Sequence, residues 1–580
     1  MSPPDASPLY KARRPSQIPL LTGEPLSHGR CQSRWFKLLV ATTLTICAVS
    51  YSRHLGIVLG YEATKFDSVC EARGLFTPLA PEDEQRRLAI RIEPESLDHD
   101  VALTPENTIL SDSFHPELSR ANILAMFDNS SQPARLDPVE LTEPCLTPST
   151  HTLPLVSKPR ITRNSPHVFF AISTTPERAV TFAPVWKHFM SSIRVSNDKS
   201  RAPGCIVTDA QGGGTGAETT RANALFRQQG LACKMQTSSK VGQRYEMRVL
   251  GLIRDAWIES ERTRFEHPDS NLVEWFVFQD DDTWWSDIGM LRTMLSAYDS
   301  REDHYFGSFS ETQGTLETFG KIGFGGAGVV LSRGLVRKMQ STLDRCAERF
   351  SDVFGGDGIM SHCAAFTRDI PLESLVEEVP SMRQMDIRGD ATGYLTSGRT
   401  PFMTLHHWTS WLTLIPGREP IAAITLFSRA ASILGGPNFL RRFVFDSGAV
   451  EVVLGYAVTL YHQPLRDEDL GAAEHSWDAH EPYLPARPKI KEGSEKLVYY
   501  ISSIDRLSPS LAIFHHTCND PALSATSLKT FSVLYDLRSL EAGLSDYPLM
   551  EEGPARASLR SSFDRQQWEQ ARKRPRIFQS

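Results

Sequence analysis

Residues 272–283 read Leu-Val-Glu-Trp-Phe-Val-Phe-Gln-Asp-Asp-Asp-Thr, an apolar run that ends on three adjacent carboxylates. Three such charges repel one another unless water or a cation neutralises them. Because alternate residues of an extended chain point to opposite sides, Asp280 and Asp282 can face one spot while Asp281 faces away. Carboxylate oxygens suit Mg²⁺ or Mn²⁺. The segment predicts a divalent-cation site after a buried strand, and the competing interpretation is an exposed acidic turn.

The chain around this segment alternates short apolar runs with helix-like stretches. The runs lie at 167–173, 204–209 and 272–278, and the helix-like stretches at 178–190 and 244–258. Short strands that alternate with helices predict an α/β unit with a largely parallel sheet. In such sheets the ligand crevice lies outside the carboxyl ends of the strands, which is where the three carboxylates lie.

Three later motifs also carry residues that suit a ligand site. Gly325 and Gly326 lie in a Phe-Gly-Gly-Ala-Gly run, which permits close backbone approach to a ligand or forms a tight loop without one. Asp357, flanked by glycines, suits a general base or a helix N-cap. His406 and His407 are adjacent, so in an extended segment only one of them joins the carboxylates; the alternative is a structural or surface pair.

The composition excludes several classes of protein. The chain has 580 residues, of which 40% are hydrophobic and 23% charged, as in ordinary globular proteins. Its net charge is −7, so a chain-wide basic field for nucleic acid is absent. The nine cysteines form no Cys-x-x-Cys pair, which excludes the spacing of a zinc ribbon or finger.

The N-terminal region predicts a membrane anchor. Six basic residues precede an uncharged stretch at 38–52, which is shorter than the roughly 20 residues that span a bilayer. Lys37 and Arg53 can extend it by snorkelling. We therefore expect a single signal-anchor helix at 37–60 with the preceding residues cytosolic and the rest lumenal. A buried core helix and a cleaved signal peptide are the alternatives.

Composition shifts divide the chain into six expected parts. Residues 61–160 are rich in Pro, Ser, Thr and acidic residues, which indicates a stem with short helices at most. Residues 416–550 predict an appended domain with a helix at 421–434 and one or two strands at 450–461. The expected parts are a cytosolic tail at 1–36, the anchor at 37–60, the stem at 61–160, the α/β domain at 161–415, the appended domain at 416–550 and a basic, solvated tail at 551–580.

In their order along residues 165–412, these motifs resemble the inverting glycosyltransferases of the Fringe and core-1/β1,3-galactosyltransferase group, glycosyltransferase family 31. The resemblance is specifically to fungal, type II membrane-anchored relatives. It implies a GT-A fold of Rossmann type, a UDP-sugar donor, a divalent metal (Mn²⁺ or Mg²⁺) and a glycan or glycoprotein acceptor. It also implies residence in the Golgi membrane, with a lumenal catalytic domain.

The resemblance assigns roles to individual residues. Asp282 resembles the principal metal ligand, with Asp280 beside it and His406 or His407 completing the set. Asp357 resembles the catalytic base. Two disulfides are implied, Cys205 with Cys233 and Cys346 with Cys363. The donor side is implied to consist of Thr174, Thr175, Arg178, Asp209, Asp280, Asp281, Gly325 and Gly326.

Two other functions compete with an inverting hexosyltransferase or N-acetylhexosaminyltransferase. The first is a membrane-anchored carbohydrate-binding protein with a degenerate transferase fold and no turnover. The intact carboxylate triad argues against it, because a site without chemistry has no need of a repulsive cluster. The second is a metal-dependent hydrolase of phosphate esters, which would need more clustered Asp and His ligands for two metals.

Overall fold

The computed structural model describes residues 89–96, 150–156, 158, 165–191, 203–209, 215–266, 272–399, 401–478, 485–506, 511–518 and 530–537. The expected anchor at 37–60 and the two expected tails lie outside these residues. No helix within the described ranges is both long and apolar enough to cross a bilayer.

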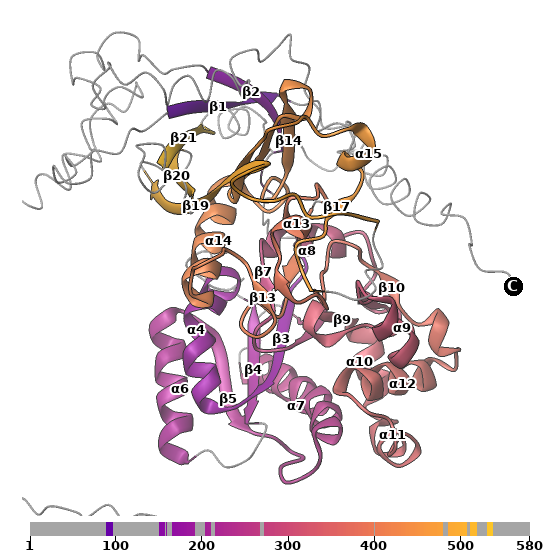
Figure 1. The fold of residues 1–580 in the computed structure, drawn as a ribbon. Helices are drawn as coiled ribbons and strands as arrows, with labels where there is room; N and C mark the ends of the chain where they lie inside the picture. The colour runs from indigo at the N-terminus through magenta and orange to yellow at the C-terminus, as the bar shows by residue number, and fades with distance from the viewer. Residues whose placement is uncertain are drawn as a thin grey trace, which may run out of the picture. The chain divides into compact units, whose positions relative to one another are not determined.

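A seven-stranded sheet carries the predicted α/β unit (Figure 1). Its strand order is β10-β8-β9-β6-β3-β4-β5. The four strands β6, β3, β4 and β5 are parallel, whereas β9 runs antiparallel to both β6 and β8. The α/β prediction is confirmed. The strands span β3 Val168–Thr174, β4 Gly204–Asp209, β5 Ala232–Thr237, β6 Trp275–Gln279, β8 Tyr305–Gly307, β9 Val329–Ser332 and β10 Glu377–Glu378.

Helices cover both faces of this sheet. Along β3, Phe170 packs into one apolar core with residues of α4 and α6, whereas Phe169 packs into a second core with residues of α7, α10 and α12. A parallel strand covered on both faces reads as a continuous apolar run, as this one does. The helices span α4 Pro176–Met190, α6 Gly216–Gln229, α7 Tyr245–Glu266, α10 Arg333–Met339 and α12 Gly356–Arg368.

The start of α4 fixes the carboxyl end of β3. Thr175 is the N-cap, and its side-chain oxygen accepts a hydrogen bond from the backbone N–H of Arg178. Pro176 follows at the first helical position, where its missing N–H costs nothing. The strand therefore passes into the helix without a connecting loop. This places the Thr174 and Arg178 side chains at the edge where the acidic segment also ends.

A second sheet follows the order β14-β15-β16-β19-β20-β21-β1-β2. Helix α14 joins this sheet to the acidic segment's surroundings: its Phe427 packs against Tyr456, next to β16, and against Trp284 of β7. One apolar core therefore continues across residue 415, where composition suggested a boundary. The elements span β7 Trp284–Trp285, α14 Pro420–Leu434, β14 Arg442–Phe445, β15 Val450–Val453, β16 Ala457–Tyr461, β19 Lys496–Arg506, β20 Leu511–Cys518 and β21 Thr530–Asp536.

The expectation that residues 61–160 contain short helices at most is wrong at two places. Residues Ala89–Ser96 form β1 and Thr150–Leu155 form β2, two strands that pair in parallel. Strand β1 also pairs in parallel with β21, near the other end of the chain. The sequence signal, an alternation of apolar and polar residues at 89–93, is short. It becomes a strand because a distant segment supplies the partner, and local composition does not show that partner.

The remaining short elements connect these layers. Helix α9 precedes the glycine run, and α11 precedes the loop that leads to Asp357. These short connecting elements are α8 Ile288–Leu295, α9 Gln313–Phe319, α11 Leu343–Arg349, η7 Leu372–Ser374, β11 Gly389–Asp390, α13 Thr392–Leu395, β12 Thr404–Leu405, β13 Leu412–Thr413, α15 Asp467–Leu470, β17 Ala473–Glu474 and β18 Ala486–Arg487. Two 3₁₀ turns, η6 Gly325–Ala327 and η8 Asp446–Gly448, complete the described elements.

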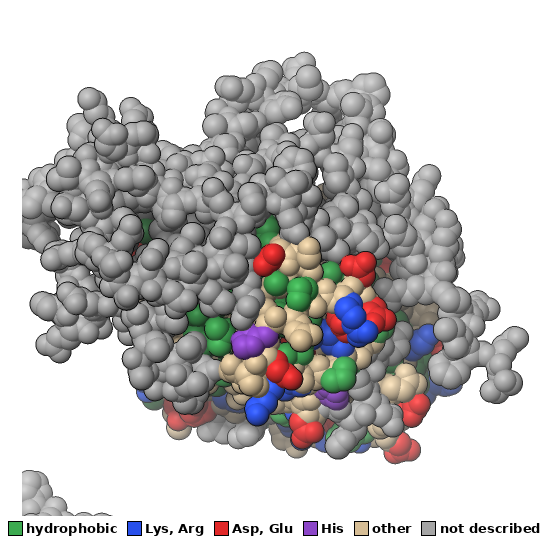
Figure 2. All heavy atoms as spheres, turned by 45° about the horizontal axis from the view of Figure 1, so that its top comes forward, with side chains coloured by type: hydrophobic (Ala, Val, Ile, Leu, Met, Phe, Trp, Pro, Cys, Tyr) green, Lys and Arg blue, Asp and Glu red, His purple; other side chains and the backbone are tan. Residues whose placement is uncertain are grey.

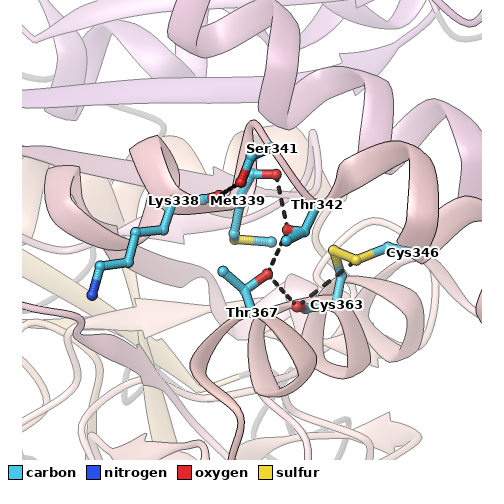
Figure 3. Close-up of a disulfide and its surroundings, with 7 residues drawn as sticks. All are labelled: Lys338, Met339, Ser341, Thr342, Cys346, Cys363 and Thr367. Atoms are coloured by element: carbon cyan, nitrogen blue, oxygen red, sulfur yellow. Dashed lines mark hydrogen bonds between the residues drawn. A yellow bond between two sulfur atoms is a disulfide. The ribbon is translucent and has the colours of Figure 1, made fainter.

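Both disulfides that the resemblance implied are present. Cys205 of β4 bonds to Cys233 of β5, and Cys346 of α11 bonds to Cys363 of α12. Beside the second bond, the Thr342 and Thr367 hydroxyls lie 2.7 Å apart, and Thr367 donates to the Cys363 carbonyl (Figure 3). The disulfide closes a short loop, which restricts the unfolded chain. It holds in place the helix whose first turn carries Asp357.

Candidate functional site

A cavity of about 510 Å³ opens at the carboxyl ends of β3 and β6. This is the edge at which the sequence pattern placed a ligand crevice. The residues that line it come from four segments: the end of β3 with the start of α4, the residues after β6, the residues after β12, and the start of α7. They are Ser173, Thr174, Thr175, Arg178, Tyr245, Asp280, Asp281, Asp282, His406, His407, Thr409 and Ser410.

The three aspartates divide into two groups, as the alternation predicts. Asp281 turns toward α4, where Arg178 donates to its carboxylate from Nε at 2.6 Å and from Nη2 at 2.5 Å. The Thr174 hydroxyl donates to the same carboxylate, and Trp186 Nε1 donates to the Asp281 carbonyl at 2.9 Å. The hydrogen bond with Asp281 raises the pKa of Arg178 above its ordinary value. Asp281 is thus fully engaged in fixing Arg178 at the cavity wall.

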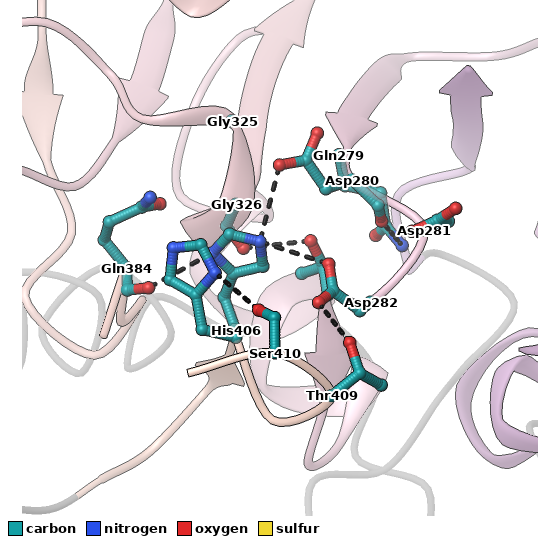
Figure 4. A network of polar contacts seen from close by, with 12 residues as sticks. Gln279, Asp280, Asp281, Asp282, Gly325, Gly326, Gln384, His406, Thr409 and Ser410 are labelled. Atoms are coloured by element: carbon teal, nitrogen blue, oxygen red, sulfur yellow. Dashed lines mark hydrogen bonds and ion pairs between the residues drawn. The ribbon is translucent and has the colours of Figure 1, made fainter. Parts of the chain in front are cut away.

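Asp280 and Asp282 instead converge on His406 (Figure 4). The His406 Nε2 atom lies 3.4 Å from Asp280 Oδ2 and 3.2 Å from Asp282 Oδ1. The other ring nitrogen, Nδ1, lies 3.2 Å from the Gln384 carbonyl oxygen, and Thr409 donates to Asp282 at 2.8 Å. Hydrogen bonds on both sides therefore hold the imidazole and the Asp282 carboxylate.

The charged groups in this cluster shift one another's pKa values. Burial opposes ionisation of Asp282, but its hydrogen bond and attraction to His406 outweigh burial and lower its pKa to about 2. Burial likewise opposes protonation of His406, yet Asp280 and Asp282 raise its pKa to about 10. Without a metal, the imidazole therefore carries a proton at neutral pH and balances the carboxylates.

The donor set fits a hard or borderline divalent cation. One ligand atom from each of Asp282, His406 and His407 lies within 4.8 Å of the others, and Asp280 adds a second carboxylate beside His406. Carboxylate oxygen with imidazole nitrogen suits Mn²⁺, and the carboxylates alone suit Mg²⁺.

We expect binding of Mn²⁺ to release about one proton at pH 7, because the His406 lone pair must be freed before the ring can bind metal. The apparent affinity should then rise by up to about tenfold per pH unit between pH 6 and 8. Calorimetric titration of MnCl₂ into the full chain, in two buffers of different ionisation enthalpy, measures the proton count. The variant His362→Gln, outside the cavity, should leave the count unchanged. A count of zero would contradict protonated His406 in the metal-free protein.

His407 departs from the expected geometry. An extended segment would send the two histidines to opposite sides, but His407 has a φ of +59°. The left-handed conformation starts a turn and brings the two rings to a centroid distance of 3.7 Å. His407 Nε2 lies 3.3 Å from Asp386 Oδ1, and its ring stacks on Trp411 at 3.8 Å. Because the backbone reverses there, both histidines line the cavity, but only His406 pairs with the carboxylates of the acidic segment.

The glycine run contributes space and a backbone donor rather than cavity lining. A Cβ atom at Gly326 would lie 2.0 Å from His406 Nδ1, far inside van der Waals contact. The backbone N–H of Gly325 donates to Asp357 Oδ2 at 2.9 Å. Gly326 thus lies against the carboxylate–histidine cluster (Figure 4), and the neighbouring Gly325 contacts Asp357.

The substitution Gly326→Ala should displace His406 and remove Mn²⁺-dependent ligand binding, at a cost of about 1–3 kcal/mol in stability. The ring has little room to move because Asp282 and the Gln384 carbonyl hold both nitrogens. Thermal melting with and without Mn²⁺ measures both effects. Gly314→Ala is the matched control, since a Cβ there meets nothing within 4 Å. Wild-type melting and metal response in Gly326→Ala would refute the assigned contact.

Asp357 lies in the first turn of α12, one residue after its start. Its side chain accepts a hydrogen bond from the backbone N–H of Gly325 in the neighbouring loop. The N-cap alternative is therefore excluded, since Gly355 holds that position. Burial, followed by the nearby charge of Asp280, raises the pKa of Asp357 above its ordinary value. A partly desolvated carboxylate of raised pKa is a stronger base than a free one.

Three expected donor-side residues are not among those that line the cavity: Asp209, Gly325 and Gly326. Asp209 is buried at the end of β4, in register with Thr174, and is not among the lining residues. Sequence reasoning missed Tyr245, Gln384 and Thr409. Thr409 follows the histidine pair closely enough for one turn to bring it back to Asp282, so its spacing was a signal. No sequence pattern around Tyr245 or Gln384 indicated that either residue belongs to the site.

Together, the parallel α/β sheet and the carboxylate–histidine cluster at its carboxyl edge define an α/β protein with a cavity and a candidate metal site at the strand ends. Residues 208–366 match the model of the Fringe-like family. The resemblance to the Fringe group is thereby confirmed for this segment. Residues 315–508 match a second model, described as a protein of unknown function, DUF604, which runs across residue 415 into the second sheet. None of the curated proteins matches the chain in sequence.

Solved structures of glycosyltransferases show distant similarity. A mannosyltransferase from Pyrobaculum calidifontis, in complex with GDP-Man and Mn²⁺, is 12% identical with a TM-score of 0.23, covering 37% of this chain. This chain spans 55% of that enzyme's length. The galactosyltransferase LgtC, with donor and acceptor sugar analogs, is 14% identical with a TM-score of 0.27, covering 46% and 96% of the two chains. Mouse xyloside xylosyltransferase 1 is 12% identical with a TM-score of 0.23, covering 37% and 84%.

Proposed function

We propose that the protein is a metal-dependent, inverting glycosyltransferase of GT-A type. It moves a hexose or N-acetylhexosamine from a UDP-sugar to a hydroxyl of a glycan or glycoprotein. The observation that carries the proposal is that the three aspartates contact different partners on two sides of the cavity. Asp280 and Asp282 meet His406 on one side of the cavity, while Asp281 fixes the Arg178 guanidinium on the other.

This arrangement suits a nucleoside diphosphate. Asp280, Asp282 and His406 would hold Mn²⁺ or Mg²⁺, which when bound neutralises the diphosphate and the charge that grows on the leaving nucleotide. The Arg178 guanidinium, itself 52% exposed at its side chain, presents its remaining N–H groups to the cavity and suits phosphate oxygens. The Thr175 side chain and the start of α4 lie beside it.

Asp357 would act as the general base. The acceptor oxygen forms a bond to the anomeric carbon, the bond from that carbon to the diphosphate oxygen breaks, and its electron pair leaves with UDP. The acceptor proton passes to the Asp357 carboxylate. The Gly325 N–H keeps this carboxylate oriented. In this single displacement the acceptor attacks the face opposite the leaving diphosphate, so the anomeric configuration inverts.

Thermal melting of the full chain with UDP or GDP, each with and without Mn²⁺, tests the donor and metal assignments together. A ligand that binds only the native state raises the free energy of unfolding by mass action, by about 2.7 kcal/mol at a hundred times its Kd, and so raises the melting temperature. We expect a rise with UDP that requires Mn²⁺. No rise with either nucleotide would reject the transferase in favour of the non-catalytic carbohydrate-binding protein. A rise with GDP alone would change the donor class.

We also propose that the protein is anchored in the Golgi membrane with this domain in the lumen. The basic residues before the uncharged stretch at 38–52 support this orientation. The two disulfides support an oxidising compartment. Protease protection of the C-terminal part in sealed microsomes tests the orientation, and cleavage of that part before detergent is added would reject it.

A further inference from the structure

The turn that carries the two histidines contacts a buried carboxylate from outside the cavity lining, Asp386. Its Oδ1 atom lies 3.3 Å from Nε2 of His407, and the side chains of Asp386 and His407 are 7% and 14% exposed. On the face shown in Figure 2, charged side chains of both signs lie open to water. Asp386 has little such solvation, so its charge costs free energy unless hydrogen-bond partners offset that cost.

Neighbouring groups hold the Asp386 carboxylate in one orientation. The Ser310 hydroxyl donates to Oδ2 at 2.6 Å, and the Gln384 side-chain amide donates to Oδ1 at 3.2 Å. The backbone N–H of Asp386 donates to the Glu311 carboxylate at 3.2 Å. These partners come from two loops, one after β8 and one after β10. The protein itself therefore fixes the direction from which the carboxylate meets His407.

The loop that carries Asp386 also holds the other histidine, by the opposite ring nitrogen. His406 Nδ1 lies 3.2 Å from the Gln384 carbonyl oxygen, which leaves Nε2 facing the carboxylates of the acidic segment (Figure 4). At His407 the order is reversed. Its Nε2 faces Asp386, while its Nδ1 lies 3.3 Å from the hydroxyl oxygen of Ser410, a residue of the cavity lining. Each imidazole thus has one nitrogen bound by this loop and the other on the cavity side.

The backbone is left-handed on both sides of the contact. His407 has a φ of +59°, and Met385, the residue before Asp386, has a φ of +60°. Such a conformation costs a non-glycine residue about 1–3 kcal/mol and persists only where the surrounding contacts determine it. Strain of this kind is typical of sites that hold a ligand. Two strained residues at one contact indicate that the relative position of Asp386 and His407 has a function beyond forming a turn.

We propose that Asp386 is a positioning residue for the metal site. Its carboxylate accepts the Nε2–H of His407, so the ring holds the tautomer whose Nδ1 lone pair remains for a divalent cation. This rests on the metal site of the proposed function, and it adds His407 to the side chains of Asp280, Asp282 and His406. A histidine that binds metal usually donates its other N–H to a carboxylate or carbonyl, which fixes the ring and makes it a stronger ligand.

Titration of the full chain with MnCl₂, with and without UDP, tests the role of Asp386. Free Mn²⁺ gives a sharp electron paramagnetic resonance signal that is lost on binding, so the Kd is measured without turnover. We expect Asp386→Asn to raise the Kd about 10- to 100-fold, and His407→Gln to raise it similarly. The double variant should bind no more weakly than His407→Gln, because Asp386 acts only through that ring. A merely structural effect of Asp386→Asn would add to the loss from His407→Gln and would overturn the inference.

Asp255→Asn is the matched control, because Asp255 is also buried and accepts a hydrogen bond, from the Ser239 N–H at 3.0 Å, but lies outside the cavity lining. It should keep the wild-type Kd. Electron spin-echo modulation of the bound Mn²⁺ counts the coordinated imidazoles, and we expect two in the wild type and one in His407→Gln.

One coordinated imidazole in the wild-type chain, or an unchanged Kd in Asp386→Asn, would also overturn the inference. Equal losses in Asp255→Asn and Asp386→Asn would do the same, because any buried carboxylate would then matter. Absence of Mn²⁺ binding to the wild-type chain, both with and without UDP, would instead reject the metal site of the proposed function, and the inference with it.

Discussion

Replacing Asp282 with Asn will remove Mn²⁺-dependent UDP binding and lower sugar transfer by about 10³-fold or more. Asp282 is buried, its pKa is lowered to about 2, and its two oxygens contact His406 and Thr409. The amide keeps the shape of the side chain but removes the charge that a divalent cation needs. The UDP-induced rise in melting temperature and the transfer rate measure the two effects.

Asp299→Asn is the matched control, because Asp299 is a surface residue paired with Arg301 and remote from the cavity lining. It should retain both the melting response and the rate. The Asp282 variant should also retain its fold, because the amide has the same shape and Asp280 still lies beside His406. An Asp282→Asn protein that still needs Mn²⁺ to bind UDP would show that the metal lies elsewhere.

The second large effect is expected for Asp357→Asn, which should keep UDP binding and lose about 10²–10⁴-fold in turnover. An amide can still accept the Gly325 N–H hydrogen bond, so the loop geometry is retained, but it cannot take a proton from the acceptor. Initial rates at saturating donor and acceptor measure the loss. The UDP melting response should be unchanged.

Asp352→Asn, in the exposed loop before Asp357, controls for a change of charge in this region. The pH profile gives an independent check. Because burial and Asp280 raise the pKa of Asp357, wild-type turnover should fall as the pH drops through that raised value, and the residual rate of Asp357→Asn should not follow this limb. Near-normal turnover in Asp357→Asn would mean that another group removes the proton.

Much of the α/β framework was predictable because local patterns determined it. The runs before Thr174, Asp209 and Asp280 are continuously apolar, so both sides of each strand are apolar. This pattern is expected of a strand that is covered on both faces. The separation of Asp281 from its two neighbours was predictable for the same reason, since successive side chains of an extended segment point to opposite sides.

The pairing of strands in the second sheet could not be predicted from local sequence patterns. Strands β1 and β2 come from a segment rich in proline and acidic residues, and β1 pairs with β21 at the far end of the described chain. No local period reveals a partner so distant in sequence. The same holds for the shared core, in which Phe427 of α14 packs against Trp284 beside the acidic segment.

The sequence by itself determined the chemistry of the site: the residue types, the strand that ends on three carboxylates, and the glycines and histidines that follow. Only the tertiary structure decided which of these groups meet. The positive φ of His407 turns both imidazoles to one side, and the missing Cβ of Gly326 lets His406 approach. Asp357 joins them through one backbone hydrogen bond from a different loop. The physical reason is that ligand geometry depends on contacts between segments, whereas sequence patterns report the conformation of one segment at a time.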